Sequence, residues 1–179
     1  MYKKVSVTIT TTLVIAAILT VSWSALQRSH AQTNENLADT ILRIHNSERA
    51  DVKVPALVWS ASLAADAQSY AEHLNSLGYS CCTTLLPHSR GTGQGENLAW
   101  GTPGYSPAAG AQSWADEKRN YHGEPIKQWN RGDPVTGHYT QMVWRSTTQV
   151  GCGTSSSDRM DILVCRYSPS GNYLGETPY

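Results

Sequence analysis

Apolar residues in the first half of the chain recur at helical spacing. Between Asn34 and Arg49, one stripe close to the 3.6-residue period predicts a helix, and it runs through Leu37, Ile41, Ile44 and Glu48. The Lys53-Val54-Pro55 run should end this helix, because proline biases the preceding residue toward extended geometry. A second helix is expected after Ser60, a good N-cap, with a C-cap at Gly78. Its apolar face consists of Leu63, Ala67, Tyr70, Ala71 and Leu74.

A third helix is predicted to begin at Ser106-Pro107, with serine as the N-cap and proline in the first helical position. Glu117 should lie between two aromatic side chains on the inner side of this helix, whereas Asp116 should point to solvent. The residues on this line are Gly110, Trp114, Glu117 and Tyr121. A lone buried charge is very costly, so Glu117 needs a partner. It is either a site residue or a structural acid bound to backbone donors.

The stretch Gly137–Trp144 combines a histidine, a glutamine and bulky apolar residues. If it forms a short helix, His138 lies on the same side as Gln141 or Met142, because residues three and four apart are neighbours. One face can then point inward with Met142 while another presents the imidazole.

Two strands are predicted near the end of the chain, at Gln149–Gly153 and Asp161–Tyr167. The polar run Thr154–Asp158 should connect them as an antiparallel hairpin. The segments 79–95 and 121–136 are predicted to be loops. Long loops in a compact domain are more often functional than idle.

The first 31 residues have the layout of a secretory signal peptide. A basic start at Lys3 and Lys4 precedes an apolar, threonine-rich run, and Ser29-His30-Ala31 places small residues at positions −3 and −1 of a cleavage site. Residues 32–179 would then form the mature domain. The alternative is an uncleaved membrane anchor, since the apolar run is just long enough to span a bilayer.

Length, charge and motifs exclude several classes of function. The 179 residues suit one domain, and the net charge of +0 gives no electrostatic argument for nucleic acid or an acidic membrane surface. We expect no nucleotide cofactor, because neither a Walker-type loop nor a dinucleotide fingerprint occurs.

Four cysteines are consistent with export, because an even number in an oxidising compartment suggests disulfides. Cys152 and Cys165 fall on the two predicted strands and are natural partners. Cys81 and Cys82 are adjacent; they could form a strained vicinal bridge, pair with other chains or stay reduced.

Four stretches in order resemble the motifs of the CAP superfamily (SCP/TAPS), which includes cysteine-rich secretory proteins, venom antigen 5 and plant pathogenesis-related protein 1. They are His45–Arg49, Gly95–Ala99, Gly137–Ser146 and Cys165–Tyr173. The resemblance extends from about Leu37 to Tyr179. It implies an α+β fold: a three-layer α-β-α sandwich with a small antiparallel sheet and long loops. It further implies a disulfide between Cys152 and Cys165, since this pair matches a bridge of the family.

The resemblance further implies a cleft lined by two histidines and two glutamates, here His88, Glu96, Glu117 and His138. Neutral imidazoles can bind Zn²⁺ or a related divalent ion, and the carboxylates can ligate it or hold its waters. Two other interpretations stay open: a hydrogen-bonded cluster that fixes the loops, and a metal-dependent hydrolase. Members of the family are mostly not convincingly enzymes.

From this resemblance we expect a secreted, monomeric, non-enzymatic protein that binds a sterol or fatty acid, or an extracellular protein partner. The aromatic residues Trp100, Tyr105, Trp114 and Tyr121 favour the hydrophobic ligand. A further alternative is a peptide precursor, because residues 169–179 resemble the segment that plant pathogenesis-related members can release. The simpler interpretation is that this segment packs over the sheet with its tyrosines.

Two features depart from the family pattern. Plant members usually carry six cysteines, whereas this chain has four. Arg166 stands where asparagine is common.

Overall fold

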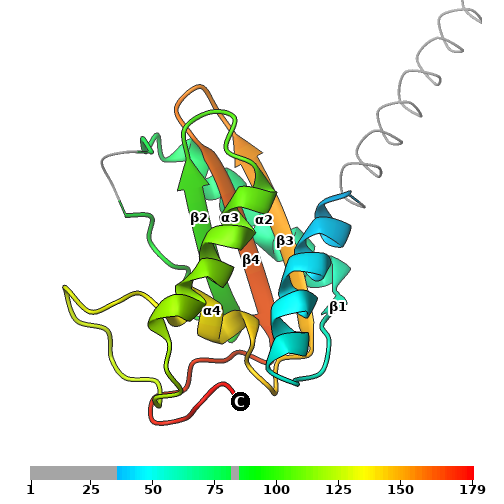
Figure 1. The fold of residues 1–179 in the computed structure, drawn as a ribbon. Coiled ribbons are helices and arrows are strands. Elements are labelled where there is room, and N and C mark those ends of the chain that lie inside the picture. Colours follow the sequence, from blue (N-terminus) through cyan, green and yellow to red (C-terminus); the bar gives the residue numbers. More distant parts are fainter. Residues whose placement is uncertain (1–35, 82–84) are drawn as a thin grey trace, which may run out of the picture. The chain divides into compact units, whose positions relative to one another are not determined.

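A four-stranded sheet in the order β1-β3-β4-β2 forms the centre of the structure (Figure 1). The computed structural model describes residues 36–81 and 85–179. β3 (Gln149–Ser156) and β4 (Asp161–Ser168) form the predicted antiparallel hairpin, and β2 (Gly95–Gly101) pairs antiparallel with β4. β1 (Val58–Trp59) pairs with β3 in parallel, so the sheet is antiparallel except at this two-residue edge.

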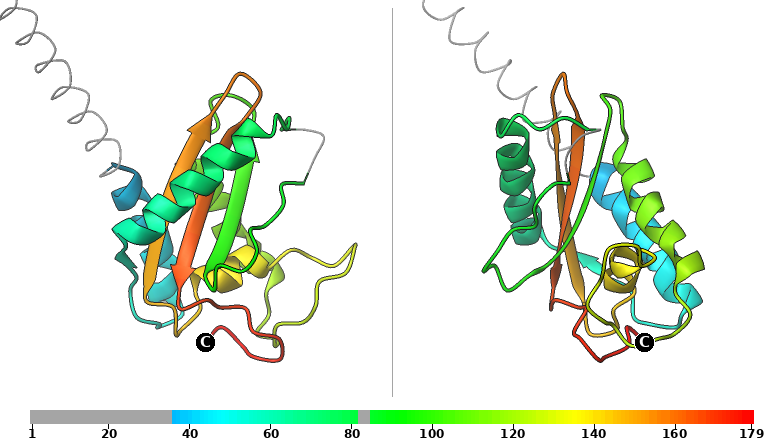
Figure 2. Two further views of the ribbon diagram at one scale, coloured as in Figure 1. Left: turned by 180° about the vertical axis from the view of Figure 1, so that it is seen from behind. Right: turned by 90° about the vertical axis from the view of Figure 1, so that its left-hand side faces the viewer.

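Helices cover both faces of the sheet and give the expected three layers (Figure 2). α2 (Ala61–Ser76) lies on one face. The other face carries the helix of residues 36–51, α3 (Pro107–Ala115) and α4 (Gly137–Met142). Alternation along β4 supplies both cores, because successive strand side chains point to opposite faces. Ile162 and Val164 pack toward α2, whereas Leu163, Cys165 and Tyr167 pack toward the other helices.

The helix starts predicted from capping residues are confirmed. The Ser60 hydroxyl accepts a hydrogen bond from Leu63 N, and the Ser106 hydroxyl accepts one from Ala109 N. Gly78 follows the end of α2 with φ of 72°. α4 also forms as predicted, with Met142 fully buried.

Several elements differ from the prediction. The helix that begins at Pro107 ends at Ala115, so Glu117 and Tyr121 lie beyond it. β2 falls in a run that the pattern did not identify as a strand, since its polar residues Glu96 and Asn97 break any simple alternation. β3 extends through Ser156, so the Thr154–Asp158 run is not all turn. The reason is a pair of hydrogen bonds from α2: the Gln68 side chain accepts from Thr154 N and donates to Thr154 O, which keeps this backbone extended.

Cys152 and Cys165 face each other in the β3–β4 register and form a disulfide, which confirms the predicted pair. Cys81 is partly buried beside the α2 core. Cys82 and residues 1–31, with the predicted signal peptide, lie outside the described residues. Within the described ranges, no helix has the length and apolar character needed to cross a membrane.

Candidate functional site

A cavity of about 430 Å³ lies beside the edge strand β2 and is lined by three of the four predicted site residues, His88, Glu96 and His138. Glu117, the fourth, does not line the cavity but binds the His138 ring. Glu96 and Asn97 are consecutive in β2, so their side chains leave the strand on opposite faces. The site is therefore assembled around the sheet edge, with one histidine–glutamate pair on each side.

The His88–Glu96 pair lies on the α2 side. His88 Nδ1 and Glu96 Oε1 are 2.6 Å apart, and the His88 side chain is 59% exposed while that of Glu96 is 6% exposed. Ser89 donates its backbone N–H to Oε1 and its hydroxyl to Oε2 of the same carboxylate. The Arg166 guanidinium completes the shell at 3.0 Å from Oε2.

These contacts keep Glu96 ionised. Burial alone would raise the pKa of Glu96, but the hydrogen bonds from His88 and Ser89 and the charge of Arg166 outweigh it and hold the pKa below its ordinary value. An ionised carboxylate only accepts hydrogen bonds, so the proton of a neutral His88 ring lies on Nδ1. Its Nε2 lone pair is then free to bind a ligand.

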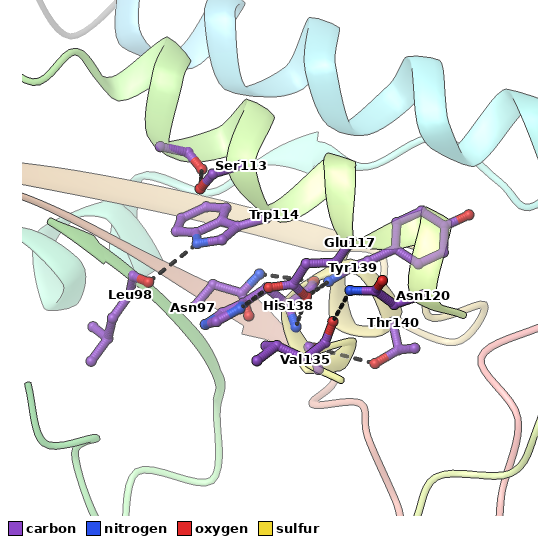
Figure 3. A network of polar contacts seen from close by, with 12 residues as sticks. Asn97, Leu98, Ser113, Trp114, Glu117, Asn120, Val135, His138, Tyr139 and Thr140 are labelled. Atoms are coloured by element: carbon purple, nitrogen blue, oxygen red, sulfur yellow. Dashed lines mark hydrogen bonds and ion pairs between the residues drawn. The ribbon is translucent and has the colours of Figure 1, made fainter. Parts of the chain in front are cut away.

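The His138–Glu117 pair lies on the other side of the sheet edge (Figure 3). His138 Nδ1 and Glu117 Oε1 are 2.6 Å apart, the same arrangement as in the first pair. Glu117 Oε2 accepts the backbone N–H groups of His138 and Tyr139. Glu117 thus binds the first turn of α4 from the short helix η1 (Asp116–Asn120) and orients the imidazole that this turn carries.

Trp114 fixes the His138 ring from one side. The two rings are nearly parallel, with centroids 6.1 Å apart and an interplanar angle of 18°. The indole N–H donates to Leu98 O, which ties this aromatic contact to β2. The predicted line is only partly confirmed, because α3 ends at Ala115 and Glu117 lies in η1, yet Trp114 and Glu117 both contact the His138 ring.

A buried chain of hydrogen bonds connects this site to the core. Asn97 Nδ2 donates to His138 O and to the Tyr167 hydroxyl. The Tyr167 hydroxyl lies 2.8 Å from His45 Nε2, and His45 Nδ1 lies 2.9 Å from Ile41 O. A carbonyl can only accept, so His45 carries its proton on Nδ1 and accepts from Tyr167 at Nε2. Sequence reasoning missed the roles of Asn97, Tyr167 and His45, although all three fall within the family-like motifs.

The donor set suits a metal with few protein ligands. Each imidazole has its Nδ1 bound by a carboxylate, which is the usual way to orient a metal-binding histidine. Across residues 36–81 and 85–179, no three His, Cys, Asp or Glu side chains are grouped so that they could hold a metal ion together. Glu96 and Glu117 therefore fit the outer shell, and a bound ion would complete its coordination with water or a ligand.

The other walls of the cavity come from the loop of residues 121–136, the cavity loop, and from the C-terminal segment, residues 169–179, and they combine polar residues with a set of apolar ones. They include Tyr121, Pro125, Ile126, Trp129, Val135 and Leu174. Of the four aromatic residues expected to favour a hydrophobic ligand, only Tyr121 lines the cavity. The missed signal was a set of isolated apolar residues in an otherwise polar loop.

The C-terminal segment holds the cavity loop by its backbone. Ile126 N donates to Glu176 O and Gly175 N donates to Ile126 O, both at 2.8 Å. Asn172 binds Thr140 and Gly137 of α4, and Tyr173 meets Trp144 edge to face. The segment is thus a wall of the cavity. The simpler interpretation placed it over the sheet, and the structure differs from it in this respect.

Comparisons of the sequence with known proteins agree with this architecture. A sequence model of the cysteine-rich secretory protein family, CAP, matches residues 42–167. Over 153 residues the chain is 39% identical to pathogenesis-related protein 1C of Nicotiana tabacum, covering 84% of this chain and 86% of that protein. It is 40% identical to pathogenesis-related protein 1 of Arabidopsis thaliana over 139 residues, covering 77% and 80%.

Solved structures with the same fold include two with similar sequences. Na-ASP-1 superimposes with a TM-score of 0.65 at 27% identity, covering 80% of this chain and 41% of that one. NaASP2, in a structure described as containing Zn²⁺, gives a TM-score of 0.66 at 25% identity and covers 81% and 85%. The predicted α+β sandwich is confirmed.

Proposed function

Because the chain belongs to the cysteine-rich secretory protein (CAP) family, we propose that it is a non-enzymatic extracellular module whose cleft binds Zn²⁺ or a related divalent ion. His88 and His138 are the ligands, through Nε2, and Glu96 and Glu117 orient them. One observation carries this proposal: both imidazoles lining the cavity are held at Nδ1 by a carboxylate at 2.6 Å.

The chemistry of the donors supports a transition metal over calcium. Imidazole nitrogen suits Zn²⁺ and its neighbours, whereas Ca²⁺ prefers a cage of oxygen ligands. The Zn²⁺-containing structure of NaASP2 adds support from a relative with the same fold. A bound ion would act as a Lewis acid with open positions, and the residues of this chain would fix its place and exclude part of the solvent.

The test is Zn²⁺ titration by calorimetry with the wild type, His138→Ala and the control His73→Ala, an exposed histidine on α2. Loss of an outer-shell partner costs about 10–100-fold in metal affinity, so removing a ligand should cost at least about 10-fold. Affinity should also fall between neutral pH and about pH 5.5, since only a deprotonated imidazole ligates. Equal affinity in wild type and His138→Ala would leave the four residues as a hydrogen-bonded cluster.

A second candidate function is binding of a small hydrophobic ligand, such as a sterol or fatty acid, in the same cavity. It is favoured by the exposure of three apolar wall residues: Trp129 is 55% exposed, Val135 43% and Leu174 70%. Large exposed apolar side chains gathered at a cavity are typical of a binding site.

Displacement of a fluorescent fatty acid would test this second function. Leu174→Glu should weaken binding because it places a charge in the apolar wall, whereas Leu85→Glu should not, since Leu85 is 82% exposed and does not line the cavity. The double variant His88→Ala/His138→Ala should keep fatty-acid binding. A hydrolytic activity that this double variant abolishes would instead favour the metal-dependent hydrolase.

Secretion belongs to the same proposal. Residues 1–31 would direct export and be removed, which leaves the disulfide between Cys152 and Cys165 in the oxidising compartment where such bonds persist. The intact mass of the protein recovered from the medium should correspond to a chain beginning at Gln32. Protein that stays in the membrane fraction with a mass beginning at Met1 would favour a membrane anchor.

A further inference from the structure

Arg166 is a buried cation behind the His88–Glu96 pair. It lies directly opposite Glu96 in the β2–β4 register, and it is 3% exposed. Its guanidinium contacts Glu96 Oε2 at 3.0 Å and donates to the Ser89 hydroxyl at 2.6 Å. On the α2 side it lies 5.0 Å from the centroid of the Tyr70 ring.

The geometry points to Arg166 as a positioning residue that fixes the orientation and tautomer of His88 through Glu96, an inference that rests on the proposed metal-binding function. Arg166 does not touch the imidazole. It holds one carboxylate oxygen while the other oxygen holds His88 Nδ1. Ser89 links Arg166 to Glu96, because its hydroxyl accepts a hydrogen bond from the guanidinium and donates one to the carboxylate.

The need for such a residue follows from where His88 lies. Its neighbours in the loop, residues 85–90, have no regular secondary structure, and its side chain is 59% exposed. Helix α4 fixes the backbone of His138, and Glu117 has backbone N–H donors in that helix. The backbone of His88 lies in no helix, and the loop beside it is held to Glu96 by a single backbone N–H, that of Ser89, so the orientation of Glu96 decides where His88 Nε2 points. The two halves of the cleft are therefore built by different means.

This arrangement leaves one polar group of Arg166 without a hydrogen bond within the part of the chain that the structure describes. Its Nε–H is buried without a hydrogen-bond partner among the described residues. A buried N–H left unpaired is rare and calls for a reason. Arg166 also lines a shallow polar hollow with Tyr70 and Ser89, but its terminal nitrogens are engaged by Ser89, Thr92 and Glu96 and offer little to a ligand there.

The experiment compares wild type, Arg166→Gln and the control Arg159→Gln, an exposed arginine in the β3–β4 connection. The first readout needs no metal: ¹⁵N chemical shifts of the histidine rings at a pH where they are neutral. We expect His88 in Arg166→Gln to become a mixture of tautomers while His138 stays unchanged. The second readout is zinc affinity, which should fall about 10-fold, the lower end for an outer-shell change.

Further variants make the result of this test unambiguous. Arg166→Lys retains the charge but not the planar fork that reaches Ser89 and Glu96 together, so its effect should be intermediate. If Arg166→Gln does not fold, Ser89→Ala removes the bridging hydroxyl and leaves the ion pair, and it should change the His88 signals in the same direction. In a Glu96→Gln background, Arg166→Gln should have little additional effect on His88, because the two act through one contact.

The outcomes separate the two proposals. If the wild type binds no zinc, the proposed function is wrong. The tautomer measurement still tests whether Arg166 positions His88, because it needs no metal. Unchanged His88 signals in Arg166→Gln overturn the positioning role. Equal changes at His88 and His138 also overturn it, because they would reflect general loosening of the fold.

Discussion

At the scale of single residues, His45 shows how burial fixes a protonation state. The ring is fully buried between Ile41 O and the Tyr167 hydroxyl, with Arg49 on the same helix and Tyr167 on β4 as the charged or titratable groups around it. Burial lowers the pKa of His45 to about 4; the hydrogen bond to Ile41 opposes this shift and the charge of Arg49 adds to it. His45 is therefore neutral at physiological pH and serves as a structural link.

This predicts an acid-dependent loss of stability. The folded pKa of about 4 lies below the unfolded value of 6.5. Between these two pKa values the folded state binds fewer protons than the unfolded state. The contribution of neutral His45 to the free energy of unfolding is therefore complete above pH 6.5 and is lost as the pH falls toward 4. Between pH 7 and pH 4 the free energy of unfolding should drop by about 3 kcal/mol more in the wild type than in His45→Gln, which does not titrate.

Urea unfolding of both proteins across this pH range would measure the difference. The buried carboxylate of Glu96 has a lowered pKa and also loses stabilising contacts in acid, but it is present in both proteins. The difference between the two curves therefore isolates His45. Parallel curves would contradict the assignment of a neutral, buried imidazole.

At the scale of elements, those with their own capping residues could be predicted from the sequence. Ser60 and Ser106 mark helix starts through side chains that bind backbone N–H groups nearby in the chain. β2 could not be predicted this way, because its partner β4 lies far along the sequence and its polar residues serve the site. Helical spacing singled out Glu117 and His138, and the resemblance joined them to His88 and Glu96, whereas Arg166 and Asn97 act through contacts that no local pattern reveals.

The junction between η1 and α4 gives a prediction at this scale. Glu117→Ala removes the acceptor of two backbone N–H groups in the first turn of α4, so stability should fall by about 1 kcal/mol, as for a lost helix cap. Amide exchange of His138 and Tyr139 should accelerate. The adjacent exposed residue provides a matched control: Asp116→Ala should change stability by less than about 0.5 kcal/mol. Equal losses in both variants would mean that Glu117 does not hold α4.

At the scale of the whole molecule, distant parts of the chain build one cavity. His88 precedes β2, His138 lies in the first turn of α4, and Leu174 follows β4, yet all three line the same cavity. The sheet order explains this, since β2 is an edge strand beside β4 and the chain that leaves β4 runs back past α4 (Figure 1). The side of the cavity with the histidine–glutamate pairs is fixed by side-chain contacts, and the side with the apolar residues depends on backbone pairing between the cavity loop and the C-terminal segment.

Shortening the chain to end at Tyr173 should therefore affect the two halves differently. It removes both backbone partners of Ile126 and the Leu174 wall, but it leaves the two histidine–glutamate pairs intact. Limited trypsin digestion should then cut the cavity loop at Lys127 and Arg131 much faster than in the full chain, because a loop without its backbone partners opens readily. Cleavage at Arg43, exposed on the helix of residues 36–51, is the internal reference. Fatty-acid binding should fall while zinc affinity changes little; equal cleavage of the loop in both proteins would show that it holds its shape without the segment.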